Sequence, residues 1–407
     1  MKFYSFLFFF FGTLSVSFTQ SNTPAVKNQQ ELNSAPPVQN NLLENKSIES
    51  QPVEKENTSS DKEESQELEK KKSTTRSVAD AQVATQLQQQ FSQVHQRAIT
   101  QNFSRSPGAV EQQEMNRVVL YYEKYAPTSF EYHFFKYVSG NYNVGEVNHL
   151  NEAERLKPKN SDVLVQKAAY SLIVADSANV RHYLSKLVEV SKLDADAVNY
   201  AKQVVNSLPE NGVLFTHGFD DGFGSFYWRE VKQERPDIRI LSLDFMQSKA
   251  YRDSLSEIGF LFPARESIDV DFFKEFCELN SEFNLFISMT FPKPYLAAVQ
   301  PKLIVCGLTF AYSNPTVSND DAWSFTPAVA VNHNEVLWET YGQAYLQKHE
   351  FGEKGKQLTA NYLPMLFLLR AHYIQLNDSK KLDQIERMID FVAVSSNRYR
   401  QVKALRN

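Results

Sequence analysis

The sequence is poor in the residues on which several protein classes depend. Two cysteines exclude a disulfide-dense scaffold and a zinc site built from cysteines. Thirteen glycines argue against a glycine-rich fibre and a large barrel with many tight turns. The 43 basic residues are outnumbered by 48 acidic ones, so no basic face for nucleic acid is expected. The 407 residues, 42% of them hydrophobic, still suffice for two or three domains.

The chain opens with an apolar run that is typical of an export signal. Lys2 precedes apolar residues from Phe3 to about Val16, and the small residues Ser17 and Thr19 follow. An uncleaved membrane anchor is the alternative, although a spanning helix needs roughly 20 apolar residues. No cysteine lies near the cleavage region, which excludes a lipoprotein. We expect a periplasmic or otherwise exported protein with no transmembrane segment after signal cleavage.

The next segment lacks the residues that build a core. Residues 19–90 contain no aromatic residue, glycine or cysteine. Residues 54–72 carry seven acidic and five basic side chains and end in three lysines. Such a composition cannot offset the entropy of ordering, so we predict a disordered tether. The lysines could contact anionic lipid or cell-wall polymer, or form a solvated charge run that the acidic neighbours neutralise.

Helical periodicity follows the tether. An apolar stripe with spacings of four, four, three and four predicts a first helix, through Val83, Leu87, Phe91, Val94 and Ala98. After Pro107-Gly108, a second helix is predicted over residues 110–125, with a buried side made of Val118, Val119, Tyr122 and Tyr125.

A degenerate repeat appears in the region that follows. Turns at Pro127, Pro158 and Leu193 are 31 and 35 residues apart, close to the period of about 34 in tetratricopeptide repeats. The segment 150–160 resembles the second helix and exit turn of such a repeat, with Ala153 at the helix crossing. We expect two or three tetratricopeptide-like hairpins that offer a concave surface to a partner. An ordinary helical bundle stacked on the next domain is the alternative.

From Asn211 the pattern changes to short apolar runs between helix-like segments. Four runs predict strands, over residues 213–216, 238–243, 285–288 and 303–308. Helices are predicted over residues 225–233, 249–258, 334–348, 358–377 and 379–396. Alternation of strands and helices predicts βαβ units and a mainly parallel sheet, closed by the C-terminal helices.

The loop after the first of these strands is the candidate binding site. In residues 216–224 a histidine, two carboxylates and three glycines converge at the end of the sheet where ligands bind. The adjacent carboxylates would repel phosphate, but could hold a cation or a sugar hydroxyl. The alternative is structural, with Asp221 or Ser225 capping the next helix and Asp220 stabilising the turn. The expected ligand-binding residues are Thr216, His217, Asp220 and Asp221.

Other chemistry is scarce, and we expect no catalytic residue, no resident metal and no cofactor. The sequence has no GxSxG or HExxH motif, and the histidines lack metal-ligand spacing. An acid at a strand end, such as Asp244, is more typical of a turn or cap. Cys277 is expected in a helix and Cys306 in a strand. They could pair, although two buried thiols are the favoured interpretation.

Several segments of the C-terminal half resemble one family. They are residues 211–223, 228–231, 235–243, 301–310 and 361–370. Over residues 205–400 the chain resembles the soluble C-terminal part of bacterial protein O-mannosyltransferase-like membrane proteins. The resemblance implies a glycosyltransferase-like accessory domain. The family's transferase chemistry is assigned to a membrane-embedded half that this chain lacks.

The candidate loop departs from the family pattern at several positions. The pattern there is roughly F-T-N-G-D-N-D-T-F, and His217 replaces its asparagine while Phe219 replaces its first acidic residue. Asp221 keeps its place, and Asp220 stands where an asparagine is usual. The resemblance therefore implies the fold of the domain and does not transfer an activity.

These observations predict an α/β fold with an all-α N-terminal part. The expected regions are a signal peptide (1–19), a tether (20–75), helical repeats (76–207), an α/β domain (208–330) and a helical closure (331–407). We expect a non-catalytic cell-envelope protein that binds protein partners or a glycan. The alternatives are an enzyme or accessory subunit in envelope glycan or protein glycosylation, and a component of a secretion or motility machine.

Overall fold

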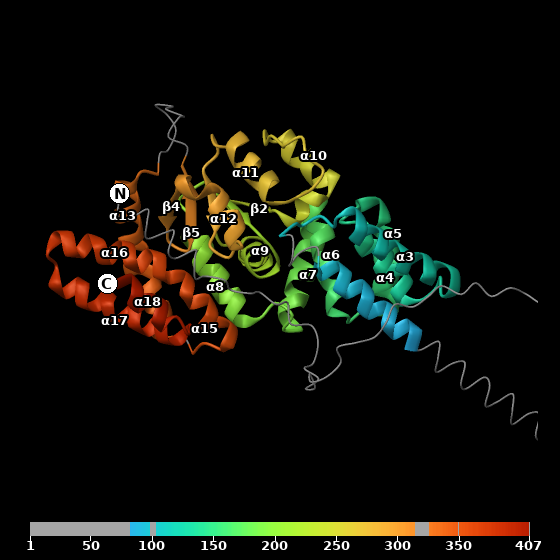
Figure 1. Cartoon of the computed structure of the whole chain (residues 1–407), viewed down its shortest axis with the longest axis horizontal. Helices are drawn as coiled ribbons and strands as arrows, with labels where there is room; N and C mark the ends of the chain where they lie inside the picture. The colour runs from blue at the N-terminus through green and yellow to red at the C-terminus, as the bar shows by residue number, and fades with distance from the viewer. Residues whose placement is uncertain (1–81, 98–102, 314–324, 349, 407) are drawn as a thin grey trace, which may run out of the picture. The chain divides into compact units, whose positions relative to one another are not determined.

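The computed structural model describes residues 82–97, 103–313, 325–348 and 350–406 (Figure 1). The predicted signal peptide and tether lie outside these ranges. From Leu87 onward the described residues belong to one structural unit. Helices come first, a five-stranded sheet with helices follows, and further helices end the chain, as predicted. None of the described helices is both long and apolar enough to cross a membrane.

The N-terminal part is built from helices that pack against their neighbours in sequence. A helix over residues 82–97 comes first. The next six are α3 (Ala109–Tyr125), α4 (Phe130–Ser139), α5 (Val147–Leu156), α6 (Ser161–Ile173), α7 (Ser177–Glu189) and α8 (Ala195–Asn206). Polar side chains cap the first turns of α4, α6, α7 and α8, namely those of Ser129, Asn160, Asp176 and Asp194. Helix α3 packs on α4, α4 on α5, and α6 on α7.

Several details of this helical region match the sequence pattern. Leu150 and Ala153 are fully buried in α5, and Pro158 lies just beyond its end. Val118 is buried in α3 as predicted, but Tyr125 is 63% exposed. Tyr125 is the last residue of α3, so its ring projects past the core and lies against Tyr121.

The sheet has five strands in the order β2-β1-β3-β5-β4. Strand β1 pairs in parallel with β2 and β3, and β5 is antiparallel to both β3 and β4. Four strands therefore run in the same direction, so the sheet is mainly parallel. The strands are β1 (Val213–Thr216), β2 (Arg239–Ser242), β3 (Leu285–Ser288), β4 (Leu303–Cys306) and β5 (Thr309–Tyr312).

The fifth strand is absent from the sequence-based prediction. The run predicted as one strand over residues 303–308 ends at Cys306, and the chain reverses through Gly307 and Leu308. Gly307 has φ +57°, a left-handed conformation that glycine adopts without a Cβ penalty. The hairpin places β5 between β3 and β4, which makes the sheet mixed at this side.

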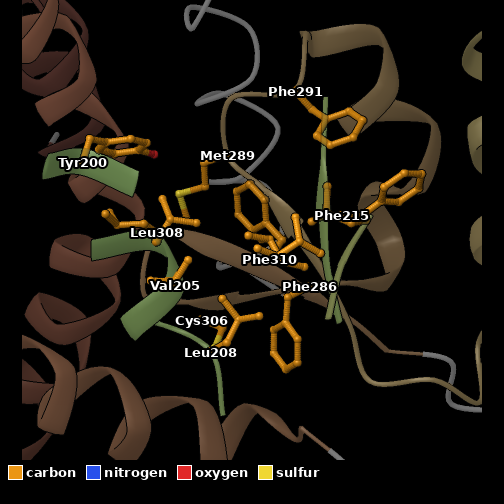
Figure 2. Close-up of a cluster of buried hydrophobic side chains, with 14 of the residues drawn as sticks. Tyr200, Val205, Leu208, Phe215, Phe286, Met289, Phe291, Cys306, Leu308 and Phe310 are labelled. Atoms are coloured by element: carbon orange, nitrogen blue, oxygen red, sulfur yellow. The ribbon is translucent and has the colours of Figure 1, made fainter. Parts of the chain in front are cut away.

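Helices cover both faces of the sheet. On one face Phe215 of β1 packs against Phe273 and Phe276, whereas the next residue, Thr216, faces Gly222 on the other. The helices are α9 (Phe219–Phe226), α10 (Lys249–Glu257), α11 (Val270–Leu279) and α12 (Lys293–Val299). Figure 2 shows side chains of α8, among them Tyr200 and Val205, facing the apolar residues of the strands.

The C-terminal helices complete the core. They are α13 (Pro327–Leu337), α14 (Gln343–Lys348), α15 (Glu353–Thr359), α16 (Leu363–Leu376), α17 (Ser379–Ser395) and α18 (Tyr399–Arg406). Helices α13 and α16 both contact β4. Asn334 of α13 donates to the carbonyl of Val305 (2.8 Å) and accepts from Gly307 N (2.7 Å), which fixes the helix to the β4–β5 turn.

The two cysteines are free, buried thiols. Cys277 lies in α11 and Cys306 in β4, as predicted, and the favoured interpretation of unpaired thiols is confirmed. Burial raises the pKa of both thiols well above the ordinary value. Because the thiolate is the reactive form, neither side chain is suited to act as a nucleophile.

Candidate site at the carboxyl edge of the sheet

Three parallel strands end at the same edge of the sheet. Strand β1 ends at Thr216, β2 at Ser242 and β3 at Ser288. Open α/β sheets bind ligands outside this edge. Polar side chains follow all three strands, with Asp221 after β1, Asp244 after β2 and Thr290 after β3.

The predicted site loop is shorter than expected. Helix α9 begins at Phe219, so Asp220 and Asp221 lie in its first turn and the loop is reduced to His217 and Gly218. The glycines of this segment serve helix packing. A Cβ at Gly222 would lie 3.1 Å from Thr216 Oγ1, and one at Gly224 would lie 2.6 Å from the Cβ of Ala201 in α8.

Asp221 is the centre of the first polar cluster. Its side chain is buried, and its Oδ1 accepts hydrogen bonds from Gly218 N (3.1 Å) and Gly222 N (2.9 Å). Its Oδ2 accepts from His217 N (3.0 Å) and from the hydroxyl of Thr290 (2.7 Å). The carboxylate thus caps α9 from inside its first turn, whereas the structural alternative placed Asp221 or Ser225 ahead of a helix over residues 225–233.

The environment of Asp221 decides what this helix end can bind. Burial raises the pKa of the carboxyl group, and the hydrogen bonds from Thr290 and the backbone oppose that shift. Three backbone N–H groups at this helix end, those of His217, Gly218 and Gly222, already donate to Asp221. The chain's own carboxylate therefore lies beside the start of α9, where it would oppose a second negative charge.

The other predicted site residues have different surroundings. Thr216 is fully buried and its hydroxyl donates to the carbonyl of Leu241 (2.9 Å), so it is part of the β1–β2 packing. The half-buried ring of His217 lies against Phe291 and Tyr295, with ring centroids 5.2 and 5.3 Å apart. Burial and the nearby positive charge of Arg105 hold the His217 pKa well below its usual range. The Asp220 side chain lies outside the described part of the structure.

A second cluster, which the sequence did not indicate, lies beside the first. The Nε and Nη2 atoms of Arg105 both lie 2.7 Å from Oδ1 of Asp244. The hydroxyl of Tyr142 donates to Oδ2 of the same carboxylate (3.1 Å). The side chain of Arg105 is 7% exposed and that of Asp244 17%, so this is a largely buried ion pair. An acid at a strand end, as Asp244 is, is typical of a turn or cap residue, and no spacing in the sequence relates it to Arg105 or Tyr142.

Both clusters meet around one group of side chains. His217 follows β1, and its ring lies against Tyr295 of α12. The positive charge of Arg105 lies close enough to both side chains to act on their pKa values, in the lowering direction. His95, from the helix over residues 82–97, also lies near Asp244 and Arg105, and burial lowers its pKa. Among the described residues, no three histidine, cysteine or acidic side chains are placed to hold a metal ion. The edge therefore carries charge and hydrogen-bonding groups that are engaged with one another.

One family model matches this part of the chain. Residues 197–264 match TMEM260-associated domain 2. The matched segment runs from α8 through α10 and contains Thr216, His217, Asp221 and Asp244. No curated protein and no solved structure matched the chain.

The match covers part of the predicted resemblance. It supports an O-mannosyltransferase-like relationship for residues 205–264, the beginning of the range that showed the resemblance. Arg105 and Tyr142 of the helical part, and Thr290 after β3, lie outside it. The matched domain therefore supplies one side of each polar cluster, and the rest of the chain supplies the other.

Proposed function

We propose that the protein is a non-catalytic accessory protein of the cell envelope that binds a protein partner or a glycan. The observation that carries this proposal is that the chain itself binds both carboxylates at the carboxyl edge of the sheet. Asp221 accepts four hydrogen bonds from its own chain, and Asp244 is paired with Arg105 and Tyr142. A general acid or base must reach a proton of its substrate. Carboxylates held in this way support a structural role for the edge.

The helical part provides the surface that we assign to a protein partner. Leu120 and Tyr125 of α3 are 61% and 63% exposed. The rings of Tyr121 and Tyr125 lie 4.8 Å apart, and Lys124 Nζ is 5.0 Å from the Tyr125 ring centroid. Exposed aromatic side chains are typical of interaction surfaces, in which tyrosine is enriched. Tetratricopeptide-like hairpins would present such residues to a partner.

Affinity capture from envelope membranes tests this assignment. We expect the double substitution Leu120→Arg and Tyr125→Arg to remove a partner that the wild-type protein retains. Val394→Arg is the matched control, because Val394 is 68% exposed on α17 and carries no proposed contact. Equal capture by both variants would contradict a binding role for α3.

A role in glycosylation is the second candidate, and the match to TMEM260-associated domain 2 favours it. In this version the protein is an enzyme or accessory subunit that acts on envelope glycans or glycoproteins. Incubation of the purified protein with envelope glycans and activated sugar donors distinguishes an enzyme from a non-catalytic accessory protein. Transfer or cleavage by wild type that Asp221→Asn abolishes, while the folded fraction persists, would establish an enzyme. Absence of turnover together with partner capture supports the accessory role.

A further inference from the structure

Residues 103–106 lie on the α/β domain as a bound peptide would. Arg105 N donates to the carbonyl of Ile268 (2.7 Å), and Ile268 N donates to the hydroxyl oxygen of Ser106 (3.1 Å). The hydroxyl of Tyr295 donates to the carbonyl of Phe103. Both backbone groups of Ile268 therefore bind this segment. The contacts join positions more than 160 residues apart in the chain.

The side chain of Arg105 enters the carboxyl edge between the two polar clusters. Two of its nitrogens reach one oxygen of Asp244, and Tyr142 occupies the other oxygen. Tyr295 and His217 lie nearby, and a Cβ at Gly218 would lie only 3.9 Å from Arg105 Nη2. The guanidinium group is thus enclosed by residues that follow β1 and β2 and by α12, and its side chain is 7% exposed.

These surroundings favour a guanidinium group over an ammonium group. A guanidinium is planar, presents several N–H groups in a fixed fork and is more weakly hydrated, so it enters a buried site at lower cost. Two of its N–H groups converge here on one carboxylate oxygen that would otherwise be buried without a counter-ion. The bond from Arg105 N to the Ile268 carbonyl and the bond from Ile268 N to the Ser106 hydroxyl hold the segment that carries this guanidinium group.

We propose that the carboxyl edge of the sheet is a guanidinium-binding site that recognises an arginine-containing segment, with residues 103–106 as its ligand in the same molecule. This inference does not depend on the proposed accessory function. A partner that presents an arginine to this edge must displace Arg105. The site then links partner binding to the attachment of the helical part.

Chemical rescue tests the site directly. Arg105→Ala leaves Asp244 without its counter-ion, and we expect the melting temperature of the full chain to fall by roughly 5–10 °C. Methylguanidinium at millimolar concentration should restore part of this loss in a saturable way. Methylammonium at equal ionic strength should restore less, because it lacks the planar fork.

Two variants keep the test specific. Arg265→Ala removes an arginine whose Nε and Nη2 each lie 2.8 Å from Glu275 Oε1, but both side chains are 40% exposed, so we expect little loss and no rescue. Adding Asp244→Asn to Arg105→Ala should abolish the rescue. If Arg105→Ala does not fold alone, recovery of folded protein only with methylguanidinium supports the site. No saturable rescue, or equal rescue without the Asp244 carboxylate, would overturn the proposal.

Discussion

At the residue scale, Asp221 shows how a group that resembles a ligand-binding residue can be committed to the fold. Both of its carboxylate oxygens accept backbone hydrogen bonds. Oδ1 accepts from Gly218 N and Gly222 N, and Oδ2 accepts from His217 N. Asparagine could not make the same set of bonds here, because an amide has only one accepting oxygen.

We therefore expect Asp221→Asn to destabilise the protein. The new NH₂ group must face at least one backbone N–H donor, and a buried donor without an acceptor costs about 1–3 kcal/mol. Urea unfolding monitored by circular dichroism measures the difference.

Asp378→Asn is the matched control for this substitution. Asp378 caps α17 by accepting from Lys381 N (3.0 Å) through Oδ1, so asparagine can keep that bond. We expect a change of only a few tenths of a kcal/mol, since asparagine and aspartate are about equal at an N-cap. Equal effects of the two substitutions would show that the second oxygen of Asp221 contributes nothing.

At the element scale, the contact between α8 and α9 sets how the helical part meets the sheet. Gly224 of α9 faces Ala201 of α8, and the missing side chain allows the two backbones to approach closely. Trp228, which follows α9, donates from Nε1 to the carbonyl of Val198 in α8 (2.6 Å). Both interactions lie within the segment that matches TMEM260-associated domain 2.

Gly224→Ala should separate these helices. The added Cβ would lie 2.6 Å from the Ala201 Cβ and 3.4 Å from the Ala197 carbonyl oxygen. Relief of this clash requires a backbone shift, for which we expect a cost of about 1–3 kcal/mol in thermal or urea unfolding.

A compensating substitution identifies the cause of that loss. Ala201→Gly in the Gly224→Ala background removes the opposing Cβ and should recover part of the stability, which a double-mutant cycle measures. Gly108→Ala is the control, because Gly108 has φ −70° and its added Cβ would meet only the mobile carboxylate end of Glu111. Additive effects at positions 224 and 201 would contradict direct contact.

At the scale of the whole molecule, partly buried histidines link stability to pH. Burial lowers the pKa of four histidines below the ordinary value of 6.5, namely His95, His133, His217 and His333. Below about pH 6.5 the unfolded chain binds more protons at these positions than the folded chain. The free energy of unfolding therefore falls as the pH drops below this value.

The contribution of His217 can be isolated with His217→Phe. The phenyl ring keeps the contacts with Phe291 and Tyr295 but cannot be protonated. Between about pH 6.5 and the lower pKa of folded His217, we expect the wild-type unfolding free energy to fall more steeply than that of the variant. The difference approaches 1.4 kcal/mol per pH unit for one proton. Parallel pH profiles from urea titrations would show that His217 is not buried as a neutral group.

The sequence by itself determined the elements whose signals are local. The apolar runs of β1 and β3 and the helix pattern of α17 were visible because burial, periodicity and capping act within a few residues. The two buried, unpaired thiols were also predicted from the sequence, because free cysteine is among the residue types most often buried.

Only the tertiary structure decided the composition of the site. Helix α9 begins at Phe219 because Asp221 caps it with help from Thr290, which is 69 residues away. Strand β5 became a separate element because β3 and β4 could pair with both of its edges. Arg105 and Asp244 are 139 residues apart, and no local pattern relates them. The two side chains meet and become buried only when the helical part packs against the carboxyl edge of the sheet.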